Sequence, residues 1–221
     1  MSRPHQQLVG RVSSYLHAVL DKDRKAAEVL VQGMIDQGSS LADIYGVLGA
    51  AQVEIGALWE RGVITVSDEH FATEVTLECI PMAAEKLRKF RREVKGYAVL
   101  CPAEGEFHFV GLKMLAELLR NEGWEVELRD SAPTASNLGG LTAQRHVDLF
   151  CLSATMPSNV ARVAEAIRII RREPAFKSAK VLVGGPAFEG KGARRIVEDA
   201  RTDLVAMSLP EALKFCKSIS H

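Results

Sequence analysis

The first ninety residues carry apolar side chains every three to four positions, which is the period of an amphipathic helix. Capping and turn residues divide this stretch into four helical segments. The first starts by about residue 4 and ends near "DKD" at 21–23, the second ends at Gly38, the third follows Ser39 and Ser40 and ends near Gly62, and the fourth runs from about Thr65 or Ser67 to about Arg92. Four helices of this length with short connections predict a bundle.

The period changes after the charged stretch "RKFRREVKG", where short β-rich runs alternate with helical ones. The five β-rich runs are "YAVLCPA", "WEVELRD", "DLFCLSAT", "KVLVGGPA" and "DLVAMS". Helices are expected near residues 108–122, 134–146, 157–173, 191–200 and 210–219. This alternation predicts an α/β fold, a Rossmann-like, flavodoxin-type doubly wound sheet of five parallel strands. The expected domains are a four-helix bundle at 1–92 and the Rossmann-like domain at 93–221.

Composition restricts the classes of partner. Lys and Arg together number 28, as do Asp and Glu, so no net charge would draw the chain to nucleic acid or to an anionic membrane. The four cysteines lack the paired spacing of a metal site, which favours buried free thiols in a reducing compartment. No signal peptide and no apolar run near the roughly 18 residues of a membrane span is evident. We therefore expect a cytoplasmic protein that binds neither membrane nor nucleic acid directly.

Candidate ligand-binding residues stand at the ends of three predicted strands. Glu106, His108 and Gly111 follow the first strand, Ser153 and Thr155 end the third, and Gly184 and Gly185 end the fourth. Between Gly111 and Ser153 lie 41 residues, and between Thr155 and Gly184 lie 28. Open parallel sheets bind ligands beyond the carboxyl ends of their strands, where the strand order reverses. These residues are therefore expected to share one site.

Their order and spacing resembles the cobalamin-binding domain of methionine synthase, of coenzyme-dependent mutases and of corrinoid methyl carriers. That family has Asp-x-His-x-x-Gly, Ser-x-Leu and Gly-Gly at similar intervals, and here Glu106 replaces Asp and Thr155 replaces Leu. The resemblance implies that cobalamin is the cofactor and that His108 is the lower axial ligand of its cobalt. A neutral imidazole suits this position, and Glu106 is placed to accept the other ring N–H.

The other residues of the pattern would receive the nucleotide tail that His108 displaces. Gly184 and Gly185 would leave room beside the backbone, Ser153 would offer a hydroxyl, and Gly111 would let the following helix start close to the ligand. Each residue alone also has a structural explanation. His108 could be a loop histidine bonded to backbone, and the glycine pair could be a tight turn; the joint spacing favours cobalamin.

A second group of candidates lies where the third predicted helix ends and the fourth begins, at Trp59, Val66, Glu69 and His70. Val66, Glu69 and His70 are close to helical spacing and share a face. The pattern resembles the cap of the CarH and LitR light-sensing transcription regulators, which bind adenosylcobalamin. The resemblance implies that Trp59 packs over the adenosyl group and that the other three residues surround it. Core packing, helix-dipole placement and an interior histidine are the structural alternatives.

On this resemblance we expect a light sensor that prefers adenosylcobalamin, rather than an enzyme. Light would cleave the cobalt–carbon bond, and the resulting change in assembly or partner binding would regulate transcription. The bundle starts by about residue 4 and leaves no room for the winged helix of that family, so a homo-oligomer or a separate regulatory protein would carry the output. Glu60 stands where the family has a histidine able to bind cobalt after illumination.

Two other functions fit the same architecture. A corrinoid methyl carrier, with methylcobalamin as its cofactor form, would pass a methyl group between methyltransferases, but it has no adenosyl group for Trp59 and its neighbours to enclose. An antirepressor that binds haem or another tetrapyrrole would also use His108, because imidazole ligates iron. A mutase fragment is disfavoured because no catalytic barrel accompanies the domain.

Overall fold

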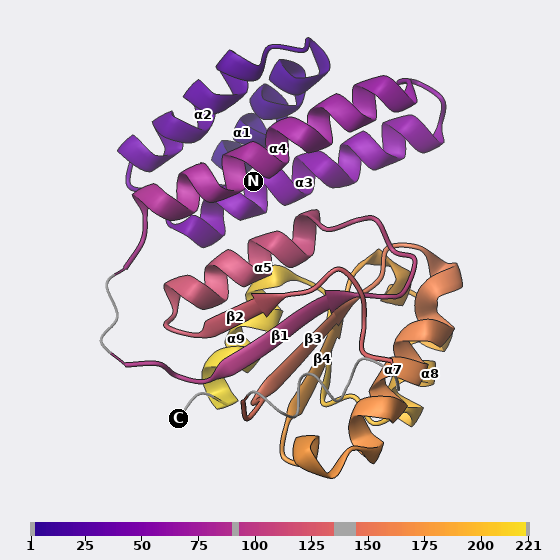
Figure 1. The fold of residues 1–221 in the computed structure, drawn as a ribbon. Helices are drawn as coiled ribbons and strands as arrows, with labels where there is room; N and C mark the ends of the chain where they lie inside the picture. Colours follow the sequence, from indigo (N-terminus) through magenta and orange to yellow (C-terminus); the bar gives the residue numbers. More distant parts are fainter. Residues whose placement is uncertain (1–2, 90–92, 135–144, 220–221) are drawn as a thin grey trace. The chain divides into compact units, whose positions relative to one another are not determined.

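The computed structural model describes residues 3–89, 93–134 and 145–219, and the chain forms two compact units (Figure 1). Unit 1 spans Met1–Arg88 and unit 2 spans Lys89–His221. The first contains only helices in its described part, and the second contains a sheet flanked by helices. The predicted fold class is therefore confirmed.

Unit 1 consists of α1 (Arg3–Leu20), α2 (Arg24–Asp36), α3 (Leu41–Glu60) and α4 (Val66–Lys86). Two of these helices begin with a capping box, in which the side chain and backbone of one residue exchange hydrogen bonds with the residue three positions later. Ser40 pairs with Asp43 at the start of α3, and Thr65 pairs with Asp68 at the start of α4. The fourth helix ends at Lys86, six residues before its predicted end, and residues 90–92 lie outside the described structure.

Large apolar and aromatic side chains fill the core of unit 1, and those of Tyr15, Ile44, Tyr45, Leu48, Ile55 and Ile80 are fully buried. Helix α3 has the length and mean hydropathy of a membrane span. Its buried residues, however, form much of this core, and a core helix meets the same criterion. Packing inside the unit therefore accounts for the apolar side chains on the buried face of α3, which makes up 39% of the apolar stretch.

Unit 2 contains five parallel strands in the order β2-β1-β3-β4-β5. The strands are β1 (Tyr97–Pro102), β2 (Glu125–Leu128), β3 (Leu149–Ser153), β4 (Lys180–Gly184) and β5 (Leu204–Ala206). The helices are α5 (Val110–Asn121), α7 (Val160–Arg172), α8 (Lys191–Asp199) and α9 (Leu209–Ile219). The helix predicted near 134–146 falls almost wholly on residues 135–144, which lie outside the described structure.

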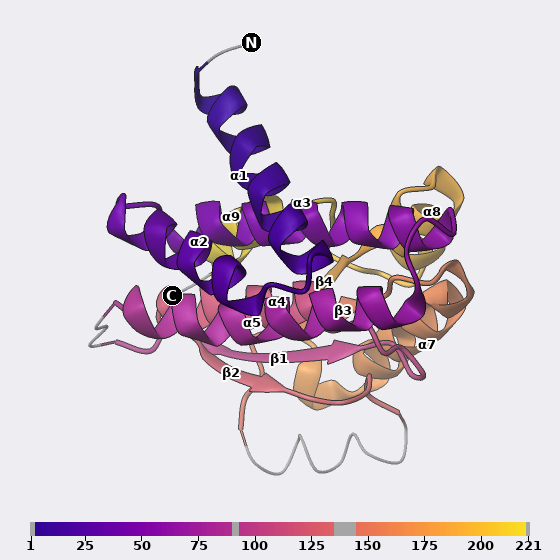
Figure 2. The ribbon, with the colours of Figure 1, turned by 90° about the horizontal axis from the view of Figure 1, so that it is seen from above.

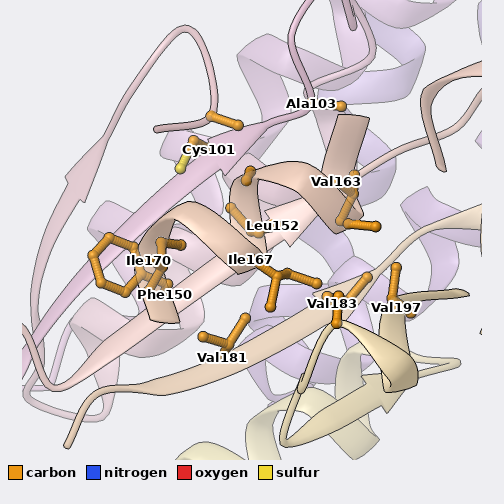
Figure 3. Packing of buried hydrophobic residues seen from close by; sticks show 14 of the residues in the cluster. Cys101, Ala103, Phe150, Leu152, Val163, Ile167, Ile170, Val181, Val183 and Val197 are labelled. Atoms are coloured by element: carbon orange, nitrogen blue, oxygen red, sulfur yellow. The ribbon is translucent and has the colours of Figure 1, made fainter. Parts of the chain in front are cut away.

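Alternate residues along each strand enter two separate cores, one on each face of the sheet. Phe150 of β3 packs with Ile167 and Ile170 of α7 and with Val181 of β4 on one face (Figure 3). Its neighbour Cys151 belongs to the core on the other face, with α5 and α9. Because successive strand side chains point to opposite faces, continuous apolar runs such as "LFCL" are needed where both faces are covered.

The strand order reverses at β1, since β2 lies on one side of β1 and β3 lies on the other. The ends of the three central strands are in register, because Pro102 of β1 pairs with Ser153 of β3 and Ser153 pairs with Gly184 of β4. The loops that leave β1 and β3 therefore start side by side at the switch point, where such folds bind ligands.

All four cysteines are free and buried, as predicted. Cys79 lies in α4 of unit 1, and Cys101, Cys151 and Cys216 lie in the cores of unit 2. Burial raises the pKa of the Cys101 thiol to about 12 and that of Cys79 to about 11. The thiolate is the nucleophilic form, so these two side chains are chemically inert at neutral pH.

Candidate functional site

The loop after β1 is built around the carboxylate of Glu106, whose residue is only 3% exposed. One oxygen, Oε1, accepts hydrogen bonds from the backbone N–H groups of Phe107 and His108, at 3.1 and 3.2 Å, and from the His108 ring at Nδ1. The hydrogen bond expected between Glu106 and His108 is thus present. The carboxylate fixes both the course of this loop and the orientation of the imidazole.

The second oxygen of Glu106 binds the loop after β3. Oε2 accepts from the backbone N–H groups of Thr155 at 2.8 Å and Met156 at 3.2 Å, and from the Asn159 side-chain amide at 3.1 Å. Phe107, His108, Thr155 and Met156 have no regular structure and Asn159 ends a short 3-10 helix, so Glu106 joins two loop segments across the switch point. Thr155, which departs from the family pattern, takes part through its backbone.

These hydrogen bonds keep Glu106 ionised. Burial opposes ionisation, but the bonds from His108, from the N–H groups of Thr155 and Met156, and from Asn159 together lower the pKa of Glu106 to about 2. An ionised carboxylate only accepts hydrogen bonds, so Nδ1 of His108 must carry the hydrogen between them. A neutral His108 ring then has its lone pair on Nε2.

The side chain of His108 is 52% exposed, whereas that of Glu106 is 1% exposed. The carboxylate is therefore buried beneath a ring that remains accessible. A histidine oriented by a buried carboxylate and open at its other nitrogen has the arrangement of a metal-binding histidine. Among the described residues, no three His, Cys, Asp or Glu side chains cluster in a way that would hold a metal ion.

Ser153, at the end of β3, has a buried hydroxyl oxygen with no hydrogen-bond partner among the described residues. Buried polar atoms without a partner are rare in proteins and call for an explanation such as a bound ligand. Ser153 pairs in register with both Pro102 and Gly184, so its hydroxyl lies at the strand ends beside the Glu106 loop.

The three predicted glycines differ in what the structure requires of them. Gly185 has φ of +110°, and a Cβ there would lie 2.3 Å from the carbonyl oxygen of Ala154. That carbonyl accepts from the N–H of Ala187 at 3.2 Å, so the turn after β4 folds tightly onto the end of β3. The tight-turn explanation thus applies to Gly185, whereas a Cβ on Gly111 would enter open space.

Asn159 and Arg162 belong to this network and were not predicted. Asn159 precedes α7 and is 5% exposed, and its side chain bonds to Glu106 instead of capping the helix. Arg162 donates to the carbonyl oxygen of Glu104 at 2.7 Å and, more weakly, to Asn159 at 3.4 Å. A polar residue at the start of a helix predicts an N-cap from sequence, so this pattern gives no signal for a contact with a distant carboxylate.

The candidates in unit 1 lie at the end of the α3–α4 hairpin. Trp59 is 47% exposed and Val66 is 53% exposed, so both are only partly packed within the unit. Glu69 accepts from the Thr73 hydroxyl at 2.9 Å, and the His70 ring, whose side chain is 74% exposed, lies 3.6 Å from Glu69. The exposure of Trp59 and His70 excludes core packing and an interior histidine as explanations within unit 1.

Fold and loop geometry together define a doubly wound domain that presents one oriented histidine at its switch point, preceded in sequence by a helical bundle. Two protein-family models, both described as B12 binding domain, match residues 12–81 and 96–207. The second match alone covers half of the chain, so the chain belongs to the family of B12-binding-domain proteins. The predicted cofactor, cobalamin, is confirmed at this level.

Curated relatives and a solved structure have the same organisation. Dimethylamine corrinoid protein 3 of Methanosarcina acetivorans is 22% identical over 216 residues, which cover 94% of both chains. A corrinoid protein of Desulfitobacterium hafniense is 24% identical over 173 residues, 76% of this chain and 80% of the relative. The structure of the Methanosarcina barkeri monomethylamine corrinoid protein matches with a TM-score of 0.78 at 19% identity, over 93% of this chain and 96% of the other.

The light-sensor prediction is wrong. The relatives that match both units are corrinoid proteins named for methylamines, and neither a photoreceptor nor a transcription regulator is among these matches. Four residues on one helical hairpin, Trp59, Val66, Glu69 and His70, do not specify the chemistry. Thr65 and Asp68 explain the start of α4, and a hydrogen bond within the bundle explains Glu69, without reference to an adenosyl group.

Proposed function

We propose that this protein is the corrinoid subunit of a methyltransferase system, a carrier that holds cobalamin and passes a methyl group between partner enzymes. This was the alternative to the light sensor, and the methylamine-named relatives support it. Their names also suggest a methylated amine as the source of the methyl group. The family match to B12 binding domains favours a cobalt corrin over haem.

The single observation that carries the proposal is the Glu106–His108 pair. In it, Nδ1 of His108 donates to Glu106, so the Nε2 nitrogen would be the one that holds the cobalt. Within the described part of the chain, the carboxylate accepts six hydrogen bonds from the loops after β1 and β3, so the imidazole starts from a fixed position. A prepositioned ligand binds a metal without a further loss of side-chain entropy.

The remaining residues at the strand ends fit a corrin with a displaced nucleotide tail. The unpartnered hydroxyl of Ser153 would receive a hydrogen bond from the tail or donate one to it. A Cβ on Gly111 would enter open space near the same edge, whereas a Cβ on Gly184 would lie 3.4 Å from the carbonyl oxygen of Ala206. The absence of a multi-residue metal cluster among the described residues also fits, since a corrin supplies four equatorial nitrogens itself.

Bound cobalamin supplies the methyl-accepting cobalt. Glu106 holds the imidazole of His108 in one orientation, and its buried carboxylate would stabilise the positive charge that the ring gains on binding a metal. In unit 1, the exposed Trp59 and Val66 offer apolar surface, and the assignment of Trp59, Val66, Glu69 and His70 to cofactor binding stays a prediction. Each methyltransferase partner must reach the cobalt, so the partners are enzymes rather than a regulatory protein; self-association stays a prediction.

Reconstitution with hydroxocobalamin tests the ligand assignment. The cobalt(II) form of the reconstituted wild type should give an electron paramagnetic resonance spectrum with coupling to one nitrogen, and labelling the protein histidines with ¹⁵N should change that coupling. His108→Ala should remove the protein-derived coupling and weaken binding at least about tenfold. A coupling that ¹⁵N labelling leaves unchanged would mean that the cofactor keeps its own base.

A transfer assay tests the carrier role. Wild type loaded with methylcobalamin should lose its methyl group to a thiol acceptor faster when an extract of its own cells is present, as read from the absorbance of methylcobalamin. Free methylcobalamin and the His108→Ala protein in the same extract are the controls. A protein that binds cobalamin through His108 but loses methyl no faster than free methylcobalamin would contradict the carrier role and leave the binding site standing.

A further inference from the structure

Helix α7 begins with two side chains that do not stabilise the helix itself. Asn159, just before α7, forms no capping hydrogen bond, and Arg162, the third residue of α7, places a positive charge where the helix dipole disfavours one. In both views of the fold, α7 lies near the end of β1 (Figures 1 and 2). Residues that break a local rule are expected where a site needs them, so their contacts with the loop after β1 indicate a role in the site.

Arg162 binds the turn that carries Glu106. The backbone N–H of Glu106 donates to the carbonyl oxygen of Ala103 at 3.0 Å, which closes a four-residue turn. Gly105, its third residue, has φ of +74°, whereas φ of Glu104 is not positive, so the turn has the type II pattern. Nη1 of Arg162 donates to the carbonyl oxygen of Glu104 at 2.7 Å. That carbonyl belongs to the central peptide, whose orientation differs between type I and type II turns, so Arg162 stabilises the type II form.

Gly105 gives the guanidinium room to reach this carbonyl. A Cβ at Gly105 would lie 2.6 Å from Nη1 of Arg162, which is closer than non-bonded atoms approach. The positive φ of Gly105 also favours glycine over other residues. A side chain at position 105 would therefore displace Arg162 from the turn, and the glycine and the arginine act as a pair.

Arg162 also fixes the orientation of the Asn159 amide. Its Nη1 lies 3.4 Å from Oδ1 of Asn159, and Nδ2 of Asn159 donates to Oε2 of Glu106 at 3.1 Å. Rotating the amide by half a turn would place its NH₂ group against the guanidinium and its oxygen against the carboxylate. Both contacts would then be repulsive, so two neighbours of opposite charge select the same orientation. Arg162 therefore reaches Glu106 by two routes, the turn and the amide.

Within the described part of the chain, Arg162 pairs with no carboxylate. Other arginines of α7 do, since Arg168 pairs with Glu165. Arg171 likewise pairs with Asp203. Arg162 instead donates to two neutral oxygens, one on the turn and one on the amide. Hydrogen bonds from a charged donor are stronger than neutral ones, so this guanidinium contributes more to the loop geometry than a neutral side chain would.

We propose that Arg162 is a positioning residue for cobalamin binding, which holds Glu106, and through it the His108 ring, in the orientation that presents Nε2 to cobalt. This inference rests on the proposed function, in which His108 is the cobalt ligand. All of the contacts that carry it lie within unit 2. An exposed side chain on α7 thus contributes to cofactor affinity through a turn and an amide.

The affinity of the full chain for hydroxocobalamin, measured by absorbance titration, tests the proposal. Arg162→Ala should weaken binding about three- to tenfold, less than the loss of a direct partner of a ligating residue. Arg168→Ala removes the same charge from an exposed position of the same helix and should bind like wild type. In a Glu106→Ala background, Arg162→Ala should change the affinity by less than about twofold, because Arg162 acts through Glu106.

Two further measurements separate positioning from a general structural role. At saturating cobalamin, the cobalt(II) form of Arg162→Ala should show the histidine-derived coupling in a smaller fraction of molecules than wild type, as read by electron paramagnetic resonance. Without cofactor, the backbone amides of Thr155 and Met156 should exchange hydrogen at least about threefold faster, since Glu106 holds them less firmly. Amides of β4 should keep their wild-type exchange rates.

Wild-type affinity of Arg162→Ala would overturn the inference, as would a loss of affinity that persists in full without Glu106. Failure of the wild type itself to bind hydroxocobalamin would instead refute the proposed function. In that case the exchange rates of Thr155 and Met156 would still decide whether Arg162 holds the Glu106 loop, because they are measured on the chain without cofactor.

Discussion

At the scale of single residues, Glu106 connects the parts of the site, because its two carboxylate oxygens bind different loops. Oε1 binds the loop that carries His108, and Oε2 binds the loop after β3. Without this carboxylate, the backbone N–H groups of Phe107, His108, Thr155 and Met156 would each lose a hydrogen-bond acceptor. One carboxylate therefore substitutes for regular secondary structure at the switch point.

Asn159 supplies a side-chain hydrogen bond that links this carboxylate to the start of α7. Under the proposed function, Asn159→Ala should weaken hydroxocobalamin binding about tenfold, because the loss of a hydrogen bond to a charged group lets Glu106 and His108 move. Absorbance titration measures the affinity. Ser158→Ala, one residue away on an exposed position, is the matched control and should bind like wild type.

Unchanged affinity of Asn159→Ala would mean that the two backbone bonds from Thr155 and Met156 suffice to hold Glu106. Asn159→Asp separates the effect of the amide hydrogen bond to Glu106 from the effect of side-chain size. It keeps the size but places a second carboxylate beside the first, and it should be worse than Asn159→Ala if the geometry in the structure is retained.

Gly185 illustrates a residue whose role depends on a distant neighbour. The sequence predicted that it leaves room for a ligand, whereas the structure shows the Ala154 carbonyl oxygen where its Cβ would lie. These residues are separated by a whole strand and helix, so their contact follows only from the register of β3 and β4. A glycine pair in the sequence does not show whether the missing side chain makes room for a ligand or for the backbone of a neighbouring strand.

At the scale of elements, the spacing of apolar residues along the chain was sufficient to predict nearly all of the described fold. Alternating β-rich and helical runs predicted the five parallel strands, and capping residues such as Ser40 and Thr65 marked helix starts. The Glu106–His108 bond was predictable because the partners are two residues apart. The Glu106–Asn159 bond spans 53 residues and depends on how two loops meet, which no local pattern encodes.

Function was predicted less well than the fold, because one of the two patterns used for it is confined to a short segment. The strand-end pattern at His108, Ser153 and Gly184 correctly indicated cobalamin, because several positions at fixed intervals had to agree. The hairpin pattern from Trp59 to His70 occupies twelve residues, and part of it is explained by the helix start and by packing within the bundle. Its resemblance to light sensors therefore carried little independent information about the chemistry.

Asp203, which precedes β5 and bonds to the start of β4, should make the stability of the fold depend on pH. Burial opposes ionisation of Asp203, but bonds from the Val181 N–H at 2.8 Å, from Arg171 and from Lys180 at 3.2 Å lower its pKa. A carboxylate with a lowered folded-state pKa stabilises the fold fully above its unfolded value of about 4, and this contribution is lost as the pH falls through the folded-state pKa.

Asp203→Asn should therefore lower the free energy of unfolding by about 2 kcal/mol at pH 7, measured by urea denaturation. The difference from wild type should narrow once the pH is below about 4. Asp21→Asn, in the exposed turn after α1, serves as the control and should change stability little at either pH. A difference that stays constant from pH 7 to pH 3 would mean that charge at Asp203 is not the cause.

At the scale of the whole molecule, each of the two units carries its own match to a B12 binding domain. A ligand that binds only the folded chain stabilises it by mass action. Hydroxocobalamin at one hundred times its Kd should raise the free energy of unfolding by about 2.7 kcal/mol, measured by urea denaturation with circular dichroism. His108→Ala at the same cobalamin concentration should gain at least about 1.4 kcal/mol less, since its affinity falls at least tenfold.

The concealed thiols make the chain suitable for site-directed fluorescence. With its four native cysteines buried, a new cysteine placed at an exposed position of each unit would react far faster with maleimide dyes than any of them. Energy transfer between two such dyes would measure the distance between the labelled positions with and without cobalamin. The native sulfur atoms would need no replacement, so the labelled chain would keep both cores intact.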